Sequence, residues 1–196
     1  MLDSFIKFLE LGLYHILNID SYDHILFIAL ISVPFLFKDW KRLLILISIF
    51  TIGHTLSLIL GVYNVINLNV NVTEWLIPIT IFCLALFNIF TAGKILLNQS
   101  NLILAIVLFS GLIHGLGFAN TFNSLVGSSN TLIAILEFAI GIEIGQLVVV
   151  VVILIFSFIS QNLLRFSKRD WILVTSSIIL GFILPLIFIS PLFSWI

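Results

Sequence analysis

Charge and cysteine are both scarce in this sequence. Only 9% of its residues are Asp, Glu, Lys or Arg, against about 25% in an ordinary soluble domain. Cys83 is the single cysteine, which excludes an internal disulfide and a thiolate metal site. The formal net charge is −1 and the basic residues form no dense patch, so nucleic acid is excluded as a partner.

Hydrophobic residues fill the sequence instead. They make up 61% of the chain and raise the mean hydropathy to +1.30, more apolar surface than a soluble core can bury. Apolar runs follow one another with short polar breaks, which predicts one all-α transmembrane domain over residues 1–196, in contact with the lipid bilayer. We expect a bundle of about six transmembrane helices, at residues 23–37, 43–62, 74–91, 102–122, 132–160 and 171–195.

The first 20 residues show a different pattern. Apolar side chains recur there at helical spacing, but Lys7, Glu10 and His15 interrupt them. This pattern predicts an amphipathic helix at the membrane surface. The segment lacks the basic start and cleavage site of a signal peptide, so we expect it to stay in the mature protein.

The few basic residues are distributed asymmetrically. The segments 63–73 and 123–130 contain no Lys or Arg. Because short cytoplasmic loops are enriched in basic residues, this asymmetry predicts a multi-pass protein of the inner (plasma) membrane with both termini outside. The basic loops, expected in the cytoplasm, contain Lys38, Lys41, Arg42, Lys94, Arg165, Lys168 and Arg169.

Ionisable side chains inside the predicted spans are candidates for function, because each is costly to bury in a membrane. At 1.5 Å per residue, His54, His114 and Glu143 fall at a similar depth, and Asp23 with His24 opens the first span. Imidazole and carboxylate are common ligands of Zn, Ni, Co and Fe. The sequence therefore predicts a metal site built from His24, His54, His114, Glu143 and Asp23.

Other polar residues are secondary candidates for the same site. Gln146 falls one turn below Glu143, and Ser110 one turn before His114, where it would orient the ring. Structural roles stay open: helix capping for Asp20, and an inter-helix hydrogen bond for Asn88. The full secondary set is His15, Asp20, Glu137, Gln146, Asn88 and Ser110.

Five segments together resemble the HupE/UreJ family of membrane proteins over nearly the whole chain. They are HILNIDSYDHILF at 15–27, FTIGHTLSL at 50–58, EWLIPITIFCLALFN at 74–88, FSGLIHGLGFA at 109–119 and EFAIGIEIGQL at 137–147. The resemblance implies a nickel or cobalt permease associated with hydrogenase and urease systems. It also implies functional roles for His15, Asp23, His24, His54, His114 and Glu143.

Two classes of function fit these residues. The first is a permease whose substrate is a divalent transition metal ion, nickel or cobalt, driven by a gradient or a partner because the chain has no P-loop. The second is an intramembrane zinc-dependent hydrolase acting on a lipid or membrane peptide, or a metal-binding sensor or chaperone. The permease is the leading hypothesis, although the scarcity of polar residues toward the cytoplasm mildly favours the second class. A homo-oligomer or an accessory protein is left open.

Overall fold

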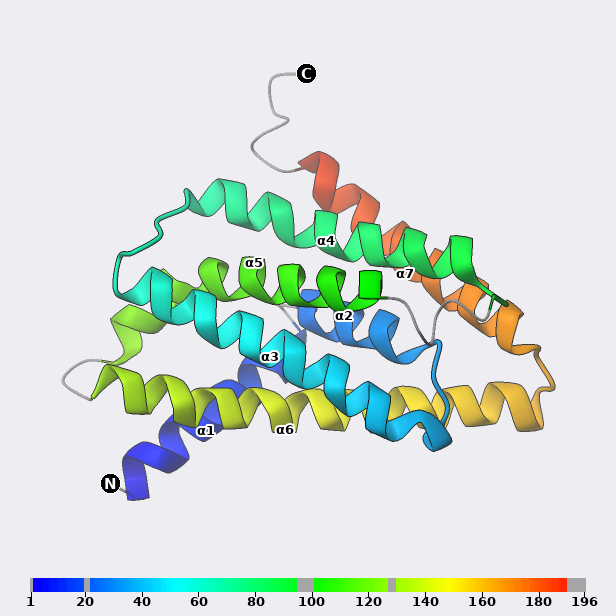
Figure 1. Ribbon diagram of the computed structural model, residues 1–196, viewed down its shortest axis with the longest axis horizontal. Coiled ribbons are helices and arrows are strands. Elements are labelled where there is room, and N and C mark those ends of the chain that lie inside the picture. Colours follow the sequence, from blue (N-terminus) through cyan, green and yellow to red (C-terminus); the bar gives the residue numbers. More distant parts are fainter. Residues whose placement is uncertain (1, 20–21, 95–100, 127–129, 190–196) are drawn as a thin grey trace.

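The computed structural model describes residues 2–19, 22–94, 101–126 and 130–189 (Figure 1). Within these ranges the chain forms helices and no strands, which confirms the predicted all-α class. A short 3-10 turn, Phe37–Asp39, precedes α3, and a π-helical turn, Ile159–Leu163, follows α6. The main helices are α1 (Leu2–Leu17), α2 (Asp23–Ser32), α3 (Trp40–Val62), α4 (Val70–Thr91), α5 (Asn101–Val126), α6 (Thr131–Phe158) and α7 (Lys168–Ile189).

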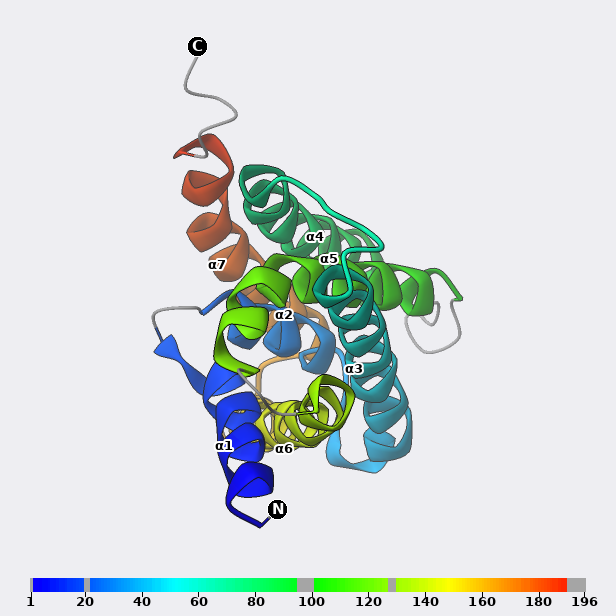
Figure 2. The same cartoon turned by 90° about the vertical axis from the view of Figure 1, so that its left-hand side faces the viewer.

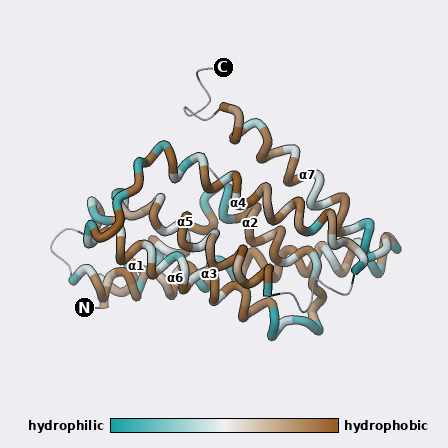
Figure 3. Tube along the Cα trace, turned by 45° about the horizontal axis from the view of Figure 1, so that its top comes forward, coloured by the Kyte–Doolittle hydropathy of each residue, from teal (hydrophilic) through white to brown (hydrophobic). Residues whose placement is uncertain are grey.

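Five of the described segments are long and apolar enough to cross a membrane. They are Phe37–Val62, Val70–Thr91, Asn101–Val126, Thr131–Leu163 and Lys168–Ile189. Hydrophobic residues fill the middle of the molecule along its length, and hydrophilic residues gather toward its ends (Figure 3). This banding is what a bundle that crosses a hydrocarbon layer requires.

The predicted first span, 23–37, is shorter than expected. Helix α2 ends at Ser32 after 10 residues, a length of about 15 Å against a hydrocarbon layer of about 30 Å. The Val33 N–H still donates to the Ala29 carbonyl, but Pro34 has no N–H with which to continue the ladder. The expected count of six spans is therefore five long helices plus this short one.

Helix α1 runs alongside α6 in the same direction. Leu2 and Ile133 line one hollow near the start of both helices. Further along, Gly12 meets Gly141, and Ile16 packs on Gly145. Gly145 lies about 21 Å along α6 at 1.5 Å per residue, so α1 ends near the middle of the bundle.

Helix α2 continues from this level toward the other end of α6. Its Val33 packs with Ile172, in the first turns of α7. Its residues from Phe27 to Ser32 are all buried, and it occupies the centre of the bundle when viewed down the long axis (Figure 2). Helices α1 and α2 therefore cover the length of the bundle in two halves, with a break between them.

Helices α3 and α5 form the tightest contact on the far side of α2. The Cα atoms of Gly111 and Gly115 lie against the main chain of Phe50 and His54, where any side chain would collide. Small residues at such positions let two helix backbones approach closely, as is common in membranes. Helix α7 packs mainly on α4 at the periphery (Figures 1 and 2). The predicted last span, 171–195, begins earlier, at Lys168, and its residues beyond 189 lie outside the described chain.

Candidate metal centre

The four histidines of the chain meet at the break between α1 and α2. His15 occupies the last turn of α1, and His24 the first turn of α2. His54 and His114 come from the middle of α3 and α5. The glycine contact described above sets these two helices close together, because Gly115 packs directly on the main chain of His54.

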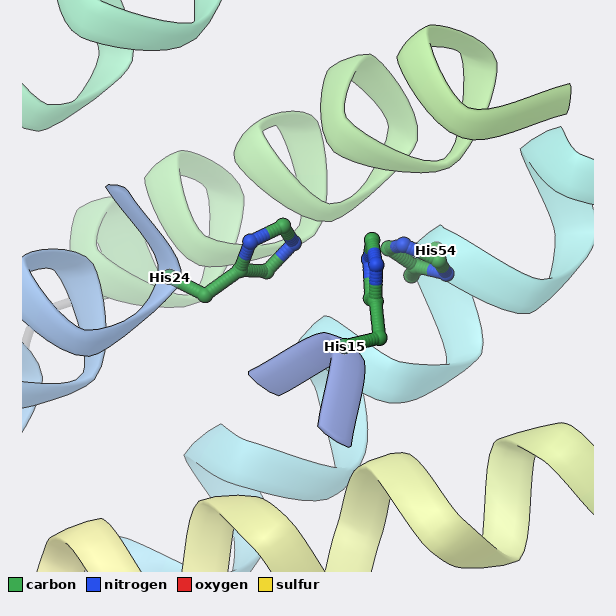
Figure 4. Close-up of side chains that lie close together, drawn as sticks. All are labelled: His15, His24 and His54. Atoms are coloured by element: carbon green, nitrogen blue, oxygen red, sulfur yellow. The ribbon is translucent and has the colours of Figure 1, made fainter. Parts of the chain in front are cut away.

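Three of these rings converge on a common point. One ring nitrogen each from His15, His24 and His54 lies within 4.8 Å of the others, and Figure 4 shows His15 between the other two. The ring centroids of His15 are 4.5 Å from His24 and 5.7 Å from His54. His114 adjoins the trio, with its centroid 4.8 Å from that of His24. We call these four residues the histidine cluster.

Two rings of the cluster are held in a defined tautomer. His114 Nδ1 lies 2.8 Å from the Ser110 carbonyl oxygen, which accepts only, so Nδ1 carries the proton. His24 Nδ1 lies 3.1 Å from Asp23 Oδ1 and donates to that carboxylate in the same way. In both rings Nε2 is left with a free lone pair, and a carboxylate behind an imidazole is a common support for metal ligands.

Five further ring nitrogens of the histidine cluster are buried without hydrogen-bond partners. This holds for Nε2 of His15, His24 and His114, and for both nitrogens of His54. His54 and His114 are 0% and 1% exposed, and a buried polar atom without a partner costs about 1–3 kcal/mol. Several such nitrogens aimed at one point are the donor set that a divalent transition metal prefers.

Aromatic rings surround the cluster and keep it apolar. Phe118 and Phe138 pack on His15, with centroids at 4.1 and 5.5 Å. Phe27 and Phe50 pack on His114, at 5.6 and 5.3 Å. A low-dielectric wall of this kind strengthens any electrostatic interaction between the nitrogens and a cation.

A hollow leads from the end of the bundle to the histidine cluster. It encloses about 810 Å³ between the second half of α1 and α5, and His15 forms part of its wall. Tyr14, Asn18 and Thr121 supply polar groups along it. His15 was only a secondary candidate in the sequence, yet it is the ring that this hollow reaches.

Glu143 forms hydrogen bonds with residues outside the histidine cluster. Its carboxylate accepts hydrogen bonds from Ser48 and Thr51 of α3 at 2.7 and 2.5 Å. Gln146, fully buried, places Oε1 3.0 Å from Thr51 Oγ1. Ser48 is not among the site residues predicted from the sequence. Its signal is the polar spacing of residues 48, 51 and 55, which puts three hydroxyl groups on one face of α3.

The side chains of the other described secondary candidates make their contacts outside the histidine cluster. Glu137 lines the hollow near the start of α1 and α6. Asn88 donates to the Leu30 carbonyl of α2 at 2.8 Å, an inter-helix hydrogen bond. The Ser110 hydroxyl donates to the Ile106 carbonyl, so it is the main chain of Ser110 that positions His114. Asp20 lies outside the described residues.

A multi-pass helical protein with buried imidazoles close together at a helix break has the donor set of a metal site within the membrane. The family model described as HupE / UreJ protein matches residues 1–190, and the chain belongs to this family. No curated protein and no solved structure matches the sequence. The family is consistent with transport of a metal across the membrane.

Proposed function

We propose that this protein is a membrane permease for a divalent transition metal ion, with Ni²⁺ as first substrate and Co²⁺ as second. The observation that carries the proposal is the trio of His15, His24 and His54 nitrogens within 4.8 Å of one another. Membership of a family of nickel and cobalt transporter type supports the choice of substrate. His114 and Asp23 complete the site, the first as a further nitrogen ligand and the second as the carboxylate behind His24.

The break between α1 and α2 suits a transport site. Discontinuous helices in transporters place binding groups near the middle of the bilayer, where the chain on either side can move independently. Here the break contributes His15 from one half and His24 from the other. A relative movement of the two halves would open the site, because the two imidazoles would separate.

The arrangement of charges supports an orientation with the His15 hollow outside. Basic residues lie where α3 begins, where α4 ends and where α6 joins α7, which is one end of the bundle. Under the positive-inside rule this end faces the cytoplasm. In a protein of the inner membrane, the start of α1 and the end of α7 then lie on the side away from the cytoplasm. The metal enters from that side.

The cytoplasmic half of the path is closed by α2. Phe27, Leu30 and Ile31 are buried at the centre of the bundle, and Asn88 fixes the Leu30 carbonyl to α4. Passage of an ion inward therefore requires α2 to shift. The closed inner half explains the scarcity of polar residues that favoured an enzyme or sensor in the sequence, because a gate that excludes water has to be apolar.

Metal content and flux together test the proposal. The protein would be purified without chelators, analysed for bound metals by elemental mass spectrometry, titrated with Ni²⁺ and Co²⁺, and reconstituted for flux. His54→Ala should lower metal affinity by about 100-fold or more, since it removes a ligand rather than a supporting partner. Ser176→Ala, a buried polar change in α7, is the control.

Three results would decide the matter. Weak Ni²⁺ or Co²⁺ binding with measurable flux, both lost in His54→Ala and kept in Ser176→Ala, supports the permease. Near-stoichiometric zinc that resists dialysis, without flux, would favour the hydrolase, sensor or chaperone. Binding that is unchanged in His54→Ala and in His24→Ala would place the metal elsewhere and contradict the site.

A further inference from the structure

A second polar group lies one helical turn from the histidines, on the same helix α3. Ser48, Thr51, Glu143 and Gln146 form it, and we call it the carboxylate cluster. The atoms that hydrogen-bond within it are all oxygens, from two hydroxyls, one carboxylate and one amide. Glu143 shares no hydrogen bond with the histidines among the described residues, so the two clusters are separate.

The oxygens of this cluster outnumber the hydrogens available to them. Thr51 Oγ1 has one hydrogen but three acceptors in reach: Glu143 Oε2 at 2.5 Å, Gln146 Oε1 at 3.0 Å and the Ile47 carbonyl at 3.3 Å. Gln146 is 0% exposed, and its Nε2 has no partner. A proton or another small cation bound among these oxygens would supply the partner that the acceptors lack.

A proton shows how the balance works. With a hydrogen on Glu143 Oε2, that group donates to Thr51 Oγ1, Thr51 donates to Gln146 Oε1, and Ser48 donates to Glu143 Oε1. If the proton leaves, rotation of the Gln146 amide turns Nε2 toward Thr51, which then donates to the charged carboxylate. In both states each short contact among Ser48, Thr51, Glu143 and Gln146 carries a hydrogen, and the amide orientation distinguishes the two states.

We infer that the carboxylate cluster binds a small monovalent cation, H⁺ or Na⁺, whose movement drives the metal. Hard oxygen donors favour such a cation, whereas imidazole nitrogen favours a transition metal. The binding site stands on its own geometry, and only its role as a driving ion rests on the proposed function. The transported metal would then bind at the histidine cluster, and the ion that drives transport would bind at the carboxylate cluster.

A groove between α3 and α6 adjoins the carboxylate cluster. It has a volume of about 420 Å³, with Glu143, Ser48 and Thr51 at one end. Thr55 and Ile59 continue it along α3, toward the end of the bundle at which α6 begins. Glu143 therefore borders this groove, whereas His15 borders the hollow between α1 and α5.

The two clusters are linked through the helices that carry them. Thr51 precedes His54 by one turn of α3, and Glu143 follows Gly141, which packs on the helix that carries His15. No described residue forms an ion pair with Glu143. The sequences of the helices packed against α6 contain these ionisable residues: Asp3, Lys7, Glu10, Tyr14 and His15 on α1, Asp23 and His24 on α2, and Lys41, Arg42 and His54 on α3.

Labelling with dicyclohexylcarbodiimide, which reacts with protonated carboxyl groups in apolar surroundings, tests the site directly. Full-length protein in detergent would be labelled across a pH series, in NaCl or choline chloride, and Glu143 modification read by mass spectrometry. Glu137 is the matched control residue, since it is a half-buried carboxyl group of the same helix in another hollow. Labelling should be at least several-fold greater at Glu143 than at Glu137.

The arms separate the two cations. Loss of labelling on adding NaCl at constant pH identifies Na⁺, whereas loss only as pH rises identifies H⁺. Labelling of Glu143 that neither condition changes, or that does not exceed Glu137, would overturn the inference.

Metal binding separates this inference from the proposed function. Glu143→Gln should keep Ni²⁺ affinity within about 3-fold while a Na⁺ or pH gradient no longer accelerates flux. Equal loss of metal binding in Glu143→Gln and His54→Ala would merge the two clusters and overturn the inference, but would leave the permease standing. Protection of Glu143 without any metal binding at the histidines would keep the cation site and reject the permease.

Discussion

The histidine cluster and the carboxylate cluster lie one turn apart on α3, yet they differ in almost every physical respect. The first presents buried nitrogens without partners, and the second presents oxygens that already bond one another. The first lies at a helix break, and the second between two continuous helices. Buried ring nitrogens without hydrogen-bond partners suit direct binding of a transition metal, whereas hydrogen-bonded oxygens can exchange a small ion with little rearrangement.

The largest effect is expected where the two clusters share a support. In Gly115→Ala the new methyl group would collide with the His54 carbonyl and the Ser57 hydroxyl, and overpacking of this kind costs roughly 1–3 kcal/mol or more. We expect lower thermal stability in detergent and loss of metal binding, because α3 must move away from α5. Carbodiimide labelling of Glu143 should change less, since its partners Ser48 and Thr51 precede the Gly115 contact at His54 along α3.

Gly181→Ala is the control for that change. A methyl group at Gly181 has no heavy atom within 4 Å, and alanine stabilises a helix by about 0.5–1 kcal/mol relative to glycine. Stability should therefore stay equal or rise. Equal losses in both variants would show that helix packing at Gly115 has no special role.

A smaller effect is expected when the histidines are kept and only their support is changed. Asp23→Asn replaces the carboxylate that accepts from His24 Nδ1, and loss of such a partner lowers metal affinity by about 10–100-fold. Titration with Ni²⁺ would measure it. Asp170→Asn, an exposed carboxylate bonded to Ser167, serves as the control and should bind metal normally.

Thr51→Val should separate the clusters by acting on one alone. The side chain keeps its shape but loses the hydroxyl that joins Glu143 to Gln146. We expect Ni²⁺ affinity within about 3-fold of the unmodified protein, because neither ring nitrogen of His54 bonds Thr51, and a lost hydrogen bond in this setting is worth about 1 kcal/mol. Gradient-driven flux in proteoliposomes should fall, and a 100-fold loss of Ni²⁺ affinity would contradict the separation.

The sequence was sufficient for the class of fold and for the depth of the buried polar residues. Scarce charge required a membrane, and the constant rise of a helix placed His54, His114 and Glu143 at one level. It was not sufficient for their directions. Helices α3, α5 and α6 have no marked separation into an apolar and a polar face, so the hydrophobic pattern does not fix their rotation. For this reason the sequence placed Glu143 with the histidines, while the structure holds it on Ser48 and Thr51.

The sequence predicted a break between residues 20 and 23, but not that this break lies in the middle of the bundle. The apolar pattern of residues 4–19 fits a helix on the membrane surface as well as a helix packed in the bundle. Only the glycine contacts with α6 show that this helix ends near the middle of the bundle. Gly12 and Gly141 carry no signal of their own, because glycine is frequent in membrane helices. Their pairing is a property of the packed helices, and it explains why His15 was ranked below His24.

The smallest effect is expected at Ser110, which separates main-chain from side-chain support of the histidine cluster. Its hydroxyl donates to the Ile106 carbonyl within α5, while its main-chain oxygen holds His114 Nδ1. Ser110→Ala removes only the first of these, so Ni²⁺ affinity should change by less than about 2-fold, a small part of the 10–100-fold range for a lost supporting partner. Ni²⁺ titration of Ser110→Ala would be compared with that of His114→Ala, which removes the ring itself and shows the full loss of affinity. A 10-fold loss in Ser110→Ala would mean that the hydroxyl turns inward and supports the ring when the metal binds.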